Sequence, residues 1–433
     1  MFSRIILHNF KSLPDIDFDL GGTNGRPIPI AMVFGENGSG KTDLIESVRF
    51  LKGTARIYGG LPDESPETGV LHPNRTGTAT TGIQALVNVY RMINTEEMSV
   101  RYFFKIGRAS TEYFMSFDKE GRVVGEELRS LIGSRTGRYY RISSDGNGIS
   151  IRMSPSFITD TKYRREIEYL IRGYWGNNTL MGIMNNQYSV KDESFMSGAV
   201  ISGFDRIRKY IDSVMVDLPS EDAPLEWPHN VWDGWTESST RGDIERFERA
   251  FDRFFTSVCT DIRHVRYEFE EKGNRIHYSL VFDQMISGRK HSIPYSLQSS
   301  GIKKLARLMP LLAGCADGKT VFIDGLDSGI HDKMIADIFS EITDSVSGQL
   351  VFTTHNTGLL ESADPKSVFI ISIDISGFKM VHSINKITGA RKNRNYREKY
   401  LNGKYYGVPY LGYLDIKDVA GKLITPIGDA DEH

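Results

Sequence analysis

The chain carries three short, uninterrupted apolar runs, each followed by small or polar residues. They lie at residues 30–34, 320–323 and 350–353. Runs of this kind are typical of strands that are buried on both faces of a parallel sheet. After the first two runs, apolar residues repeat at helical spacing, at positions 44, 45, 48 and 51 and at positions 334, 335, 338 and 339. The pattern therefore predicts an α/β fold built on a parallel sheet.

Other segments alternate between apolar and polar residues, as half-buried strands do. Residues 3–9 and 15–20 predict two strands joined by a short turn. Residues 265–269 and 276–282 flank Lys272-Gly273-Asn274 and predict a hairpin. Residues 83–128 predict an antiparallel meander. Its expected strands are residues 86–90, 100–106, 113–117 and 122–124.

The remaining segments divide into helices and loops. Residues 155–215 are mostly helical in pattern, and a helix with an aromatic face is expected to begin at Asp243. A further helix is expected after residues 295–301. We expect loops at residues 54–81, which are rich in Gly, Pro, Thr and Ser, and at residues 217–243, where Pro and Trp occur without periodicity.

The bulk composition is that of an ordinary globular protein. Of the 433 residues, 25% are charged and 39% are hydrophobic, and the net charge is −2. Such a balance does not favour nucleic-acid binding by overall charge, so a local patch would be needed. The two cysteines, Cys259 and Cys315, lack metal-ligand spacing and are expected to be reduced core residues. Without a signal peptide or a long apolar segment, we expect a soluble, cytoplasmic protein with no membrane contact.

The first apolar run leads into a complete P-loop motif, G-x-x-x-x-G-K-[ST]. The residues expected to hold the nucleotide are Gly35, Asn37, Gly38, Ser39, Gly40, Lys41 and Thr42. Backbone amides of the loop and the following helix N-terminus favour negative charge. Lys41 is expected to reach the β- and γ-phosphates, and Thr42 to ligate Mg²⁺. The sequence therefore predicts a site for ATP and Mg²⁺.

Three later segments supply candidates for the rest of this site. Asp324 ends the second apolar run and is expected to hold Mg²⁺, and His355 follows the third run. Asp327 lies just after Asp324. Ser299 and Gly301 belong to a hydroxyl-rich turn that opens a helix, which is a phosphate-binding device. Taken singly, each has a simpler interpretation as a strand-end aspartate, a helix cap or a loop residue. Their order after a P-loop favours one shared site.

These motifs together carry a family resemblance. GENGSGKT, SLQSSGIKKL, VFIDGLDSGIHD and VFTTHN resemble the ABC-type ATPase head of SMC, Rad50 and RecF proteins. More closely, the chain resembles the AAA-type ATP-binding proteins of bacterial abortive-infection and anti-phage loci, including ATPases paired with RloB-like or other Toprim nucleases, as in PARIS-type systems. Residues 7–12 match the N-terminal strand and turn of that family, and residues 397–409 match its C-terminal segment.

The resemblance implies roles for individual residues. Ser299 and Gly301 would form the signature that meets the γ-phosphate on a second protomer, so a homodimer or larger homo-oligomer is implied. Asp327 would face across that dimer, and His355 would be the switch histidine with a catalytic part beside Asp324. Asn9 and Lys11 would touch the nucleotide. The Q-loop glutamine is assigned only as Gln187, with Gln84 as the alternative.

The resemblance also implies an architecture and partners. Residues 1–54 and 241–385 would form the two halves of a P-loop ATPase core of the ABC head type. Residues 55–240 would be an inserted mixed α/β region, and residues 386–433 a basic C-terminal segment. The implied function is an ATP-gated sensor and scaffold in anti-phage defence. It would control an effector nuclease encoded nearby and respond to a nucleic acid or phage protein.

One departure from the family pattern changes the expected chemistry. Family members place a glutamate after the Walker B aspartate, whereas this chain has Gly325. A glycine can neither accept a proton nor orient the attacking water, so we expect ATP binding with slow hydrolysis. Two other functions stay open: a DNA-repair ATPase of the RecF or Rad50 kind, and a structural protein that binds ATP without hydrolysing it.

Overall fold

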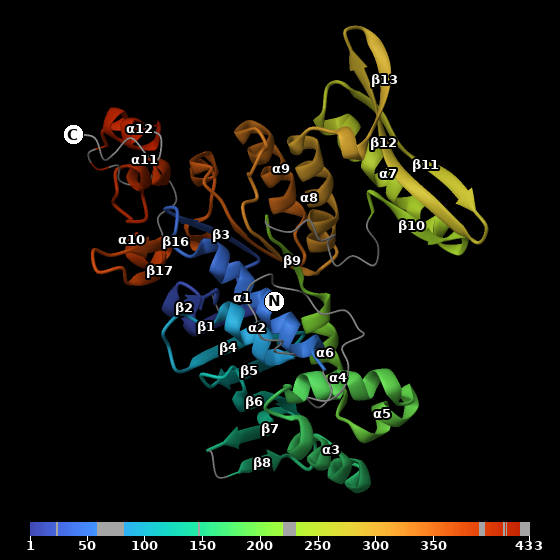
Figure 1. The fold of residues 1–433 in the computed structure, drawn as a ribbon, viewed down its shortest axis with the longest axis vertical. Coiled ribbons are helices and arrows are strands. Elements are labelled where there is room, and N and C mark those ends of the chain that lie inside the picture. The colour runs from blue at the N-terminus through green and yellow to red at the C-terminus, as the bar shows by residue number, and fades with distance from the viewer. Residues whose placement is uncertain are drawn as a thin grey trace, which may run out of the picture.

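The computed structural model describes residues 1–22, 25–58, 82–145, 148–219, 231–388, 395–409, 412 and 414–424 (Figure 1). Its centre is a largely parallel sheet. The strand order across that sheet is β17 (Lys379–Ser383), β16 (Val368–Ile373), β3 (Ile30–Gly35), β15 (Gln349–Thr353), β14 (Thr320–Ile323) and β9 (Met215–Asp217). Only β17 pairs antiparallel with its neighbour among these described strands. The three apolar runs are therefore β3, β14 and β15, as the sequence predicts.

The central sheet separates two hydrophobic cores. Successive residues of β3 point to opposite faces, so Ala31 and Val33 enter one core while Met32 and Phe34 enter the other. Helix α1 (Lys41–Arg56) covers the first face. Helices α8 (Ser300–Ala316) and α9 (Asp332–Ser345) cover the second. The alternation explains why these strands read as continuous apolar runs.

A second, antiparallel sheet packs on the other side of α1. Its strand order is β2 (Leu13–Asp19), β1 (Phe2–Phe10), β4 (Met98–Ile106), β5 (Ala109–Phe117), β6 (Val123–Ile132), β7 (Arg135–Ser144) and β8 (Ile149–Met153). The predicted strand pair at the N-terminus and the meander are confirmed. One prediction is wrong, because residues 86–90 belong to helix α2 (Ile83–Tyr90). Ile83, Val87 and Tyr90 are buried at helical spacing, a period that so short a segment conceals.

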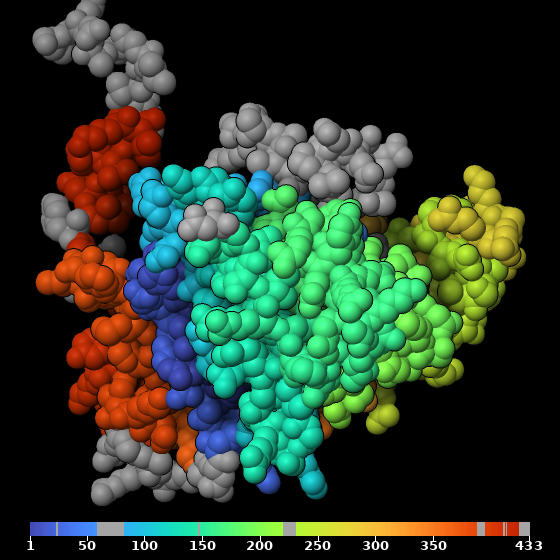
Figure 2. Space-filling model, turned by 90° about the horizontal axis from the view of Figure 1, so that it is seen from below, coloured from blue at the N-terminus to red at the C-terminus, as the bar shows by residue number. Residues whose placement is uncertain are grey.

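The expected helical region is confirmed as well. It contains α3 (Thr161–Tyr174), α4 (Leu180–Val190), α5 (Glu193–Ala199) and α6 (Ser202–Ser213). Seen from below, the teal and green residues of this region cover much of the surface (Figure 2). Helix α4 packs on the C-terminal end of α1, where Thr179 donates a hydrogen bond to the Thr54 carbonyl, 2.8 Å away. Of the expected loop at 54–81, residues 54–56 belong to α1 and residues 59–81 lie outside the described residues.

A separate arm precedes helix α8 and projects from the sheet (Figure 1, yellow). It consists of β10 (Asp233–Glu237), α7 (Arg241–Val258), β11 (Ile262–Lys272), β12 (Arg275–Ile286) and β13 (Arg289–Pro294). The predicted hairpin is β11–β12, and α7 begins two residues before the predicted start at Asp243. The expected loop at 217–243 is wrong in part, because β10 pairs with β12. Its five residues carry one apolar side chain, Trp235, and therefore give no strand pattern.

The last described helices lie on the opposite side of the sheet from the arm (Figure 1). After β17 come α10 (Ile384–Thr388), α11 (Tyr396–Leu401) and α12 (Ile416–Ile424). Figure 1 shows this part in orange and red beside β16. Helix α11 is fixed to the segment after β15 by an ion pair between Arg397 and Glu361 at 2.7 Å. Within the described ranges, no helix is long and apolar enough to span a membrane.

Candidate nucleotide-binding site

The candidate residues meet at one edge of the central sheet. The P-loop follows β3, Asp324 follows β14, and Thr354 and His355 follow β15. These three strands are parallel, and β15 lies between the other two. Their carboxyl ends consequently reach the same edge, where ligands of open α/β sheets bind. Parallel pairing thus brings together motifs that are far apart in the sequence.

The P-loop is a tight turn that depends on its glycines. Gly38 and Gly40 have φ values of +80° and +98°, which side-chain-bearing residues rarely adopt. A Cβ at Gly40 would lie 2.4 Å from Leu13 Cδ2, so the loop is held closely against the β1–β2 turn. The ammonium of Lys41 donates to the carbonyls of Gly35 and Glu36, at 2.8 and 2.9 Å. Burial lowers the pKa of Lys41, and Asp324 opposes that shift.

Thr42 and Asp324 form a direct link between the two halves of the site. The Thr42 hydroxyl donates to Asp324 Oδ2 across 2.7 Å, although 282 residues separate them. The other oxygen, Oδ1, accepts from the Thr353 hydroxyl at 2.6 Å. A hydroxyl beside a carboxylate is an oxygen donor set that suits Mg²⁺. Asp324 and Thr42 therefore fit the metal roles expected of them.

Asp327 and His355 lie on the same side of the site. The backbone N–H of His355 donates to Asp327 Oδ2 at 3.2 Å. The other carboxylate oxygen of Asp327 is buried and has no hydrogen-bond partner in the structure. The same is true of the Ser39 hydroxyl. Buried polar atoms without partners are costly and are commonly satisfied by a ligand or water. Burial and the charge of Lys41 lower the pKa of His355, so its imidazole is neutral at pH 7.

Gly325 has a conformational reason to be glycine. Its φ is +64°, and a Cβ there would lie 2.4 Å from Ser328 Oγ. Its N–H donates to the Thr353 hydroxyl at 2.7 Å. A residue with a side chain would therefore be strained and directed towards Ser328. The backbone at position 325 adopts a conformation that favours glycine, so this position differs from the family pattern in its conformation as well as in its side chain.

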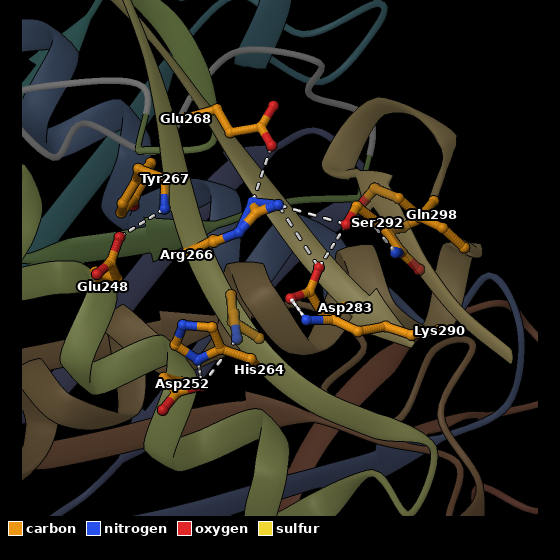
Figure 3. A network of polar contacts seen from close by, with 12 residues as sticks. Glu248, Asp252, His264, Arg266, Tyr267, Glu268, Asp283, Lys290, Ser292 and Gln298 are labelled. Atoms are coloured by element: carbon orange, nitrogen blue, oxygen red, sulfur yellow. Dashed lines mark hydrogen bonds and ion pairs between the residues drawn. The ribbon is translucent and has the colours of Figure 1, made fainter. Parts of the chain in front are cut away.

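The signature residues lie between the arm and the sheet. Ser299 is the N-cap of α8, and its hydroxyl accepts a hydrogen bond from the Ile302 N–H at 3.4 Å. The preceding Gln298 is buried, and its side-chain amide donates to Gln284 Oε1 of β12 at 3.0 Å. Figure 3 shows Gln298 beside the polar network of the arm. A Cβ at Gly301 would approach the Gly329 carbonyl to 3.0 Å, so the signature turn lies against the loop that holds Asp327.

That network is organised by a buried carboxylate of the arm. Asp283, 1% exposed, forms ion pairs with Lys290 at 2.7 Å and Arg266 at 3.7 Å. It also accepts from the Ser292 hydroxyl at 2.7 Å (Figure 3). These contacts join β11, β12 and β13, from which the chain continues directly into the signature turn. The arm therefore supports that turn.

The N-terminal candidates occupy the neighbouring turn. Asn9 and Lys11 both have positive φ, 53° and 48°. The Asn9 amide donates to the Glu97 carbonyl at 3.1 Å, and Lys11 pairs with Glu46 of α1. The turn is thus fixed to α1 next to the P-loop, and direct contact of these two side chains with a nucleotide stays a prediction.

The two Q-loop candidates lie elsewhere. Gln187 is on α4, which packs against the C-terminal end of α1, whereas the P-loop lies at its N-terminal end. The 16 residues of α1 make it about 24 Å long. Gln84 is on α2, where its amide donates to Asn177 Oδ1 at 3.2 Å. Neither position favours a role at the phosphates.

Sequence reasoning missed three contributors to the site. Thr353 bridges Asp324 and Gly325, but it reads as the last residue of an apolar strand. Lys379 of β17 donates to the Gly38 carbonyl of the P-loop. A Cβ at Gly407 would lie 2.5 Å from Ile370 Cγ2 and 3.6 Å from Gly35 Cα. Thr353 lies in VFTTHN and Gly407 in the segment 397–409, but the resemblance implies no role for either, and Lys379 lies in no motif. Only the order of strands in the sheet brings them to the P-loop.

Several solved structures resemble this chain at low sequence identity. The solved structures it resembles include an SMC head bound to the C-terminal winged-helix domain of ScpA (TM-score 0.44, 14% identity, 89% of this chain and 98% of that one). They also include the SMC head domain of Thermotoga maritima (0.39, 13%, 88% and 98%) and the recombination mediator RecF (0.39, 12%, 88% and 98%). A search of curated proteins found no match.

The match to a protein family is more extensive. The family described as "AAA domain, putative AbiEii toxin, Type IV TA system" matches residues 30–361, a range that begins with the P-loop strand and extends past His355. The predicted α/β P-loop fold of the ABC-ATPase head type, with an inserted mixed α/β region, is confirmed. The chain belongs to this AAA domain family.

Proposed function

We propose that this chain is an ATP-binding head that closes on a second copy of itself when Mg·ATP is bound. The observation that carries this proposal is the 2.7 Å hydrogen bond between Thr42 and Asp324. In P-loop proteins this hydroxyl and this carboxylate hold the Mg²⁺ that accompanies the nucleotide. When bound, Mg²⁺ would be held by Thr42 and Asp324 and would supply positive charge against that of the phosphates. Lys41 and the loop amides would hold the phosphates.

Hydrolysis in this proposal is slow. A missing general base typically costs about 10²–10⁴-fold in rate. The conformation at Gly325 supports this, because that position has no side chain to orient water. Asp327 and His355 also lie at this site, and Asp327 has one buried oxygen without a hydrogen-bond partner. The closed, ATP-bound dimer would therefore be long-lived, which suits a scaffold better than a motor.

In the closed dimer, the signature turn of one copy would meet the nucleotide bound to the other copy. Ser299 and Gly301 lie at the N-terminus of α8, where backbone amides favour an anion. We propose that they contact the γ-phosphate held by Lys41 of the partner, and that Asp327 faces the same interface. In this scheme residues 1–54 and 241–385 are the two halves of the head. Residues 55–240 are an insertion between them that contributes β9 to the central sheet, and residues 386–433 form the C-terminal segment.

We propose a biological role in defence against phage. The family description names an AbiEii toxin of a type IV toxin–antitoxin system, which supports an abortive-infection function. The chain would act as an ATP-gated sensor and scaffold that controls an effector nuclease of the Toprim or RloB-like kind encoded nearby. Its trigger would be a phage protein or a nucleic acid.

Two measurements test the proposal. Binding of the fluorescent analogue mant-ATP should be tight for the parent and lost in Lys41→Met, with the unfolding midpoint unchanged. The complete locus, carried in a phage-sensitive host, should reduce plaque formation, and Lys41→Met should abolish the protection at equal protein level. Protection that survives Lys41→Met would contradict ATP gating, and undetectable mant-ATP binding by the parent would contradict the site itself.

A further inference from the structure

A second lysine contacts the P-loop from outside the motif. Lys379 opens strand β17, opposite Ile373 of β16. Its ammonium donates to the Gly38 carbonyl at 2.8 Å and to the Ser12 hydroxyl at 2.6 Å. Gly38 is 341 residues away in sequence and lies near the middle of the loop. Lys41 binds the carbonyls of Gly35 and Glu36, so the two lysines hold different parts of one loop.

The contact with Gly38 fixes the orientation of a functional peptide group. In a trans peptide the carbonyl of Gly38 and the N–H of Ser39 point in opposite directions. Lys379 binds the Gly38 carbonyl, and the Ser39 N–H on the other side of the peptide donates to the Glu36 carbonyl at 3.2 Å. This peptide therefore belongs to the turn whose backbone amides cradle phosphates in P-loop proteins. An ammonium bound to the carbonyl also polarises the peptide and strengthens its N–H as a donor.

The same lysine connects the loop to helix α1. Ser12 donates from both its hydroxyl and its N–H to Asp43, which directly follows Thr42. Lys379 therefore joins the loop, the β1–β2 turn and the first turn of α1. Burial lowers the pKa of Lys379, and the charge of Asp43 opposes that shift.

We infer that Lys379 is a positioning residue for nucleoside triphosphates, which fixes the Gly38–Ser39 peptide and with it the conformation of the phosphate-binding loop. This inference rests on the proposed function. It adds to the P-loop a cation that no P-loop motif contains. The lysine acts through the loop, so its removal should weaken the binding of every nucleotide that carries a β-phosphate.

The test compares Lys379→Met with Lys386→Met in the full chain. Lys386 of α10 is a matched control, because its side chain is largely exposed and pairs with Asp19 at 2.8 Å. We expect Lys379→Met to bind mant-ATP and mant-ADP about tenfold more weakly than the parent, which corresponds to one charge-assisted hydrogen bond. Lys386→Met should bind both as the parent does.

A second readout separates positioning from direct contact. Without nucleotide, amide hydrogen exchange of residues 35–42 should be faster in Lys379→Met than in the parent or in Lys386→Met. Equal affinities of the two variants would overturn the inference. Weaker binding with unchanged exchange would overturn the positioning role in favour of direct contact with the nucleotide. If Lys379→Met fails to fold, Lys379→Gln serves in both measurements. Failure of the proposed function would show differently, as absent binding by the parent.

Discussion

At the scale of single residues, Gly325 determines what this site can catalyse. From the sequence alone, a glutamate at this position should restore hydrolysis. The structure changes that expectation, because φ is +64° and a side chain would start towards Ser328. A left-handed conformation costs a residue with a Cβ about 1–2 kcal/mol. The glycine is therefore part of the local backbone design.

We expect Gly325→Glu to lower the free energy of unfolding by about 1–2 kcal/mol and to raise single-turnover hydrolysis less than tenfold. Gly318→Glu is the control, because Gly318 has φ +89° and only Ser347 Oγ near its would-be Cβ, at 3.7 Å. Urea denaturation and quench-flow at saturating Mg·ATP provide the two measurements. A hundredfold faster turnover in Gly325→Glu would mean that the new carboxylate reaches the nucleotide.

A second residue-scale prediction concerns Glu126, a fully buried carboxylate of β6. It accepts hydrogen bonds from five groups. They are the Tyr113 and Tyr140 hydroxyls, the Trp175 indole and the N–H groups of Leu180 and Met181. Two of these lie at the N-terminus of α4, where negative charge is favoured. Burial raises the pKa of Glu126, and the hydrogen bonds oppose that shift.

Glu126→Gln should therefore lower the free energy of unfolding by about 2–3 kcal/mol, because an amide NH₂ cannot accept from these donors. Glu127→Gln is the neighbouring control. Glu127 pairs with Arg138 at 2.7 Å near the surface, and its loss should cost about 0.2–1 kcal/mol. Urea denaturation at pH 7 compares both with the parent. Equal losses of unfolding free energy in the two variants would show that the buried network contributes no more to stability than the surface ion pair.

At the scale of elements, the C-terminal segment 396–408 acts as a strap at the edge of the central sheet that carries the P-loop. The Tyr400 ring packs on Phe34, and its hydroxyl donates to the Gly407 carbonyl at 2.9 Å. Arg397 holds the same segment to Glu361, shortly after His355. The strap thus joins the P-loop strand to the segment that follows the switch histidine.

Gly407→Ala should loosen this strap. Its Cβ would meet Ile370 Cγ2 at 2.5 Å at a φ of +68°, and overpacking of a core costs about 1–3 kcal/mol beyond the left-handed conformation. Gly403→Ala has φ +70° and nothing within 4 Å, so it isolates the conformational cost. We expect Gly407→Ala to be less stable than Gly403→Ala in urea and to bind mant-ATP more weakly. Indistinguishable variants would mean that the strap does not support the P-loop.

The elements also show what the sequence could predict. Buried parallel strands and long amphipathic helices were predictable, because their apolar periods persist over many residues. Helix α2 was mistaken for a strand, since six of its eight residues are apolar and the helical period shows only in the three that are buried. Strand β10 gave no sequence pattern, because its extended conformation depends on pairing with β12. The P-loop, Asp324 and the signature turn were predicted from their motifs, whereas the contacts of Thr353, Lys379 and Gly407 depend on the sheet order.

At the scale of the whole molecule, the arm and the signature turn are one continuous unit. Gln298 is anchored in β12, and Ser299 follows it with its side chain exposed at the start of α8. A support of this kind keeps the turn in place for a ligand that arrives from outside. If closure of two heads uses this turn, a bulky cation at Ser299 should block it.

We therefore expect Ser299→Arg to abolish Mg·ATP-dependent association, because an arginine would occupy the closing surface. The N-cap hydrogen bond is lost as well, so its cost of about 0.5–2 kcal/mol must be checked by urea denaturation. Ser345→Arg is the control. Ser345 is an exposed serine at the end of α9, on the opposite edge of the sheet from the P-loop.

Sedimentation velocity with and without Mg·ATP measures the association, and mant-ATP titration of each variant measures binding by the single head. The expected pattern is a nucleotide-dependent dimer for the parent and Ser345→Arg, and a monomer for Ser299→Arg that still binds mant-ATP. Because a head holds its own phosphates with Lys41, loss of association without loss of binding is the signature of a site completed by a second copy. An ATP-dependent dimer of Ser299→Arg would place the contact between heads elsewhere.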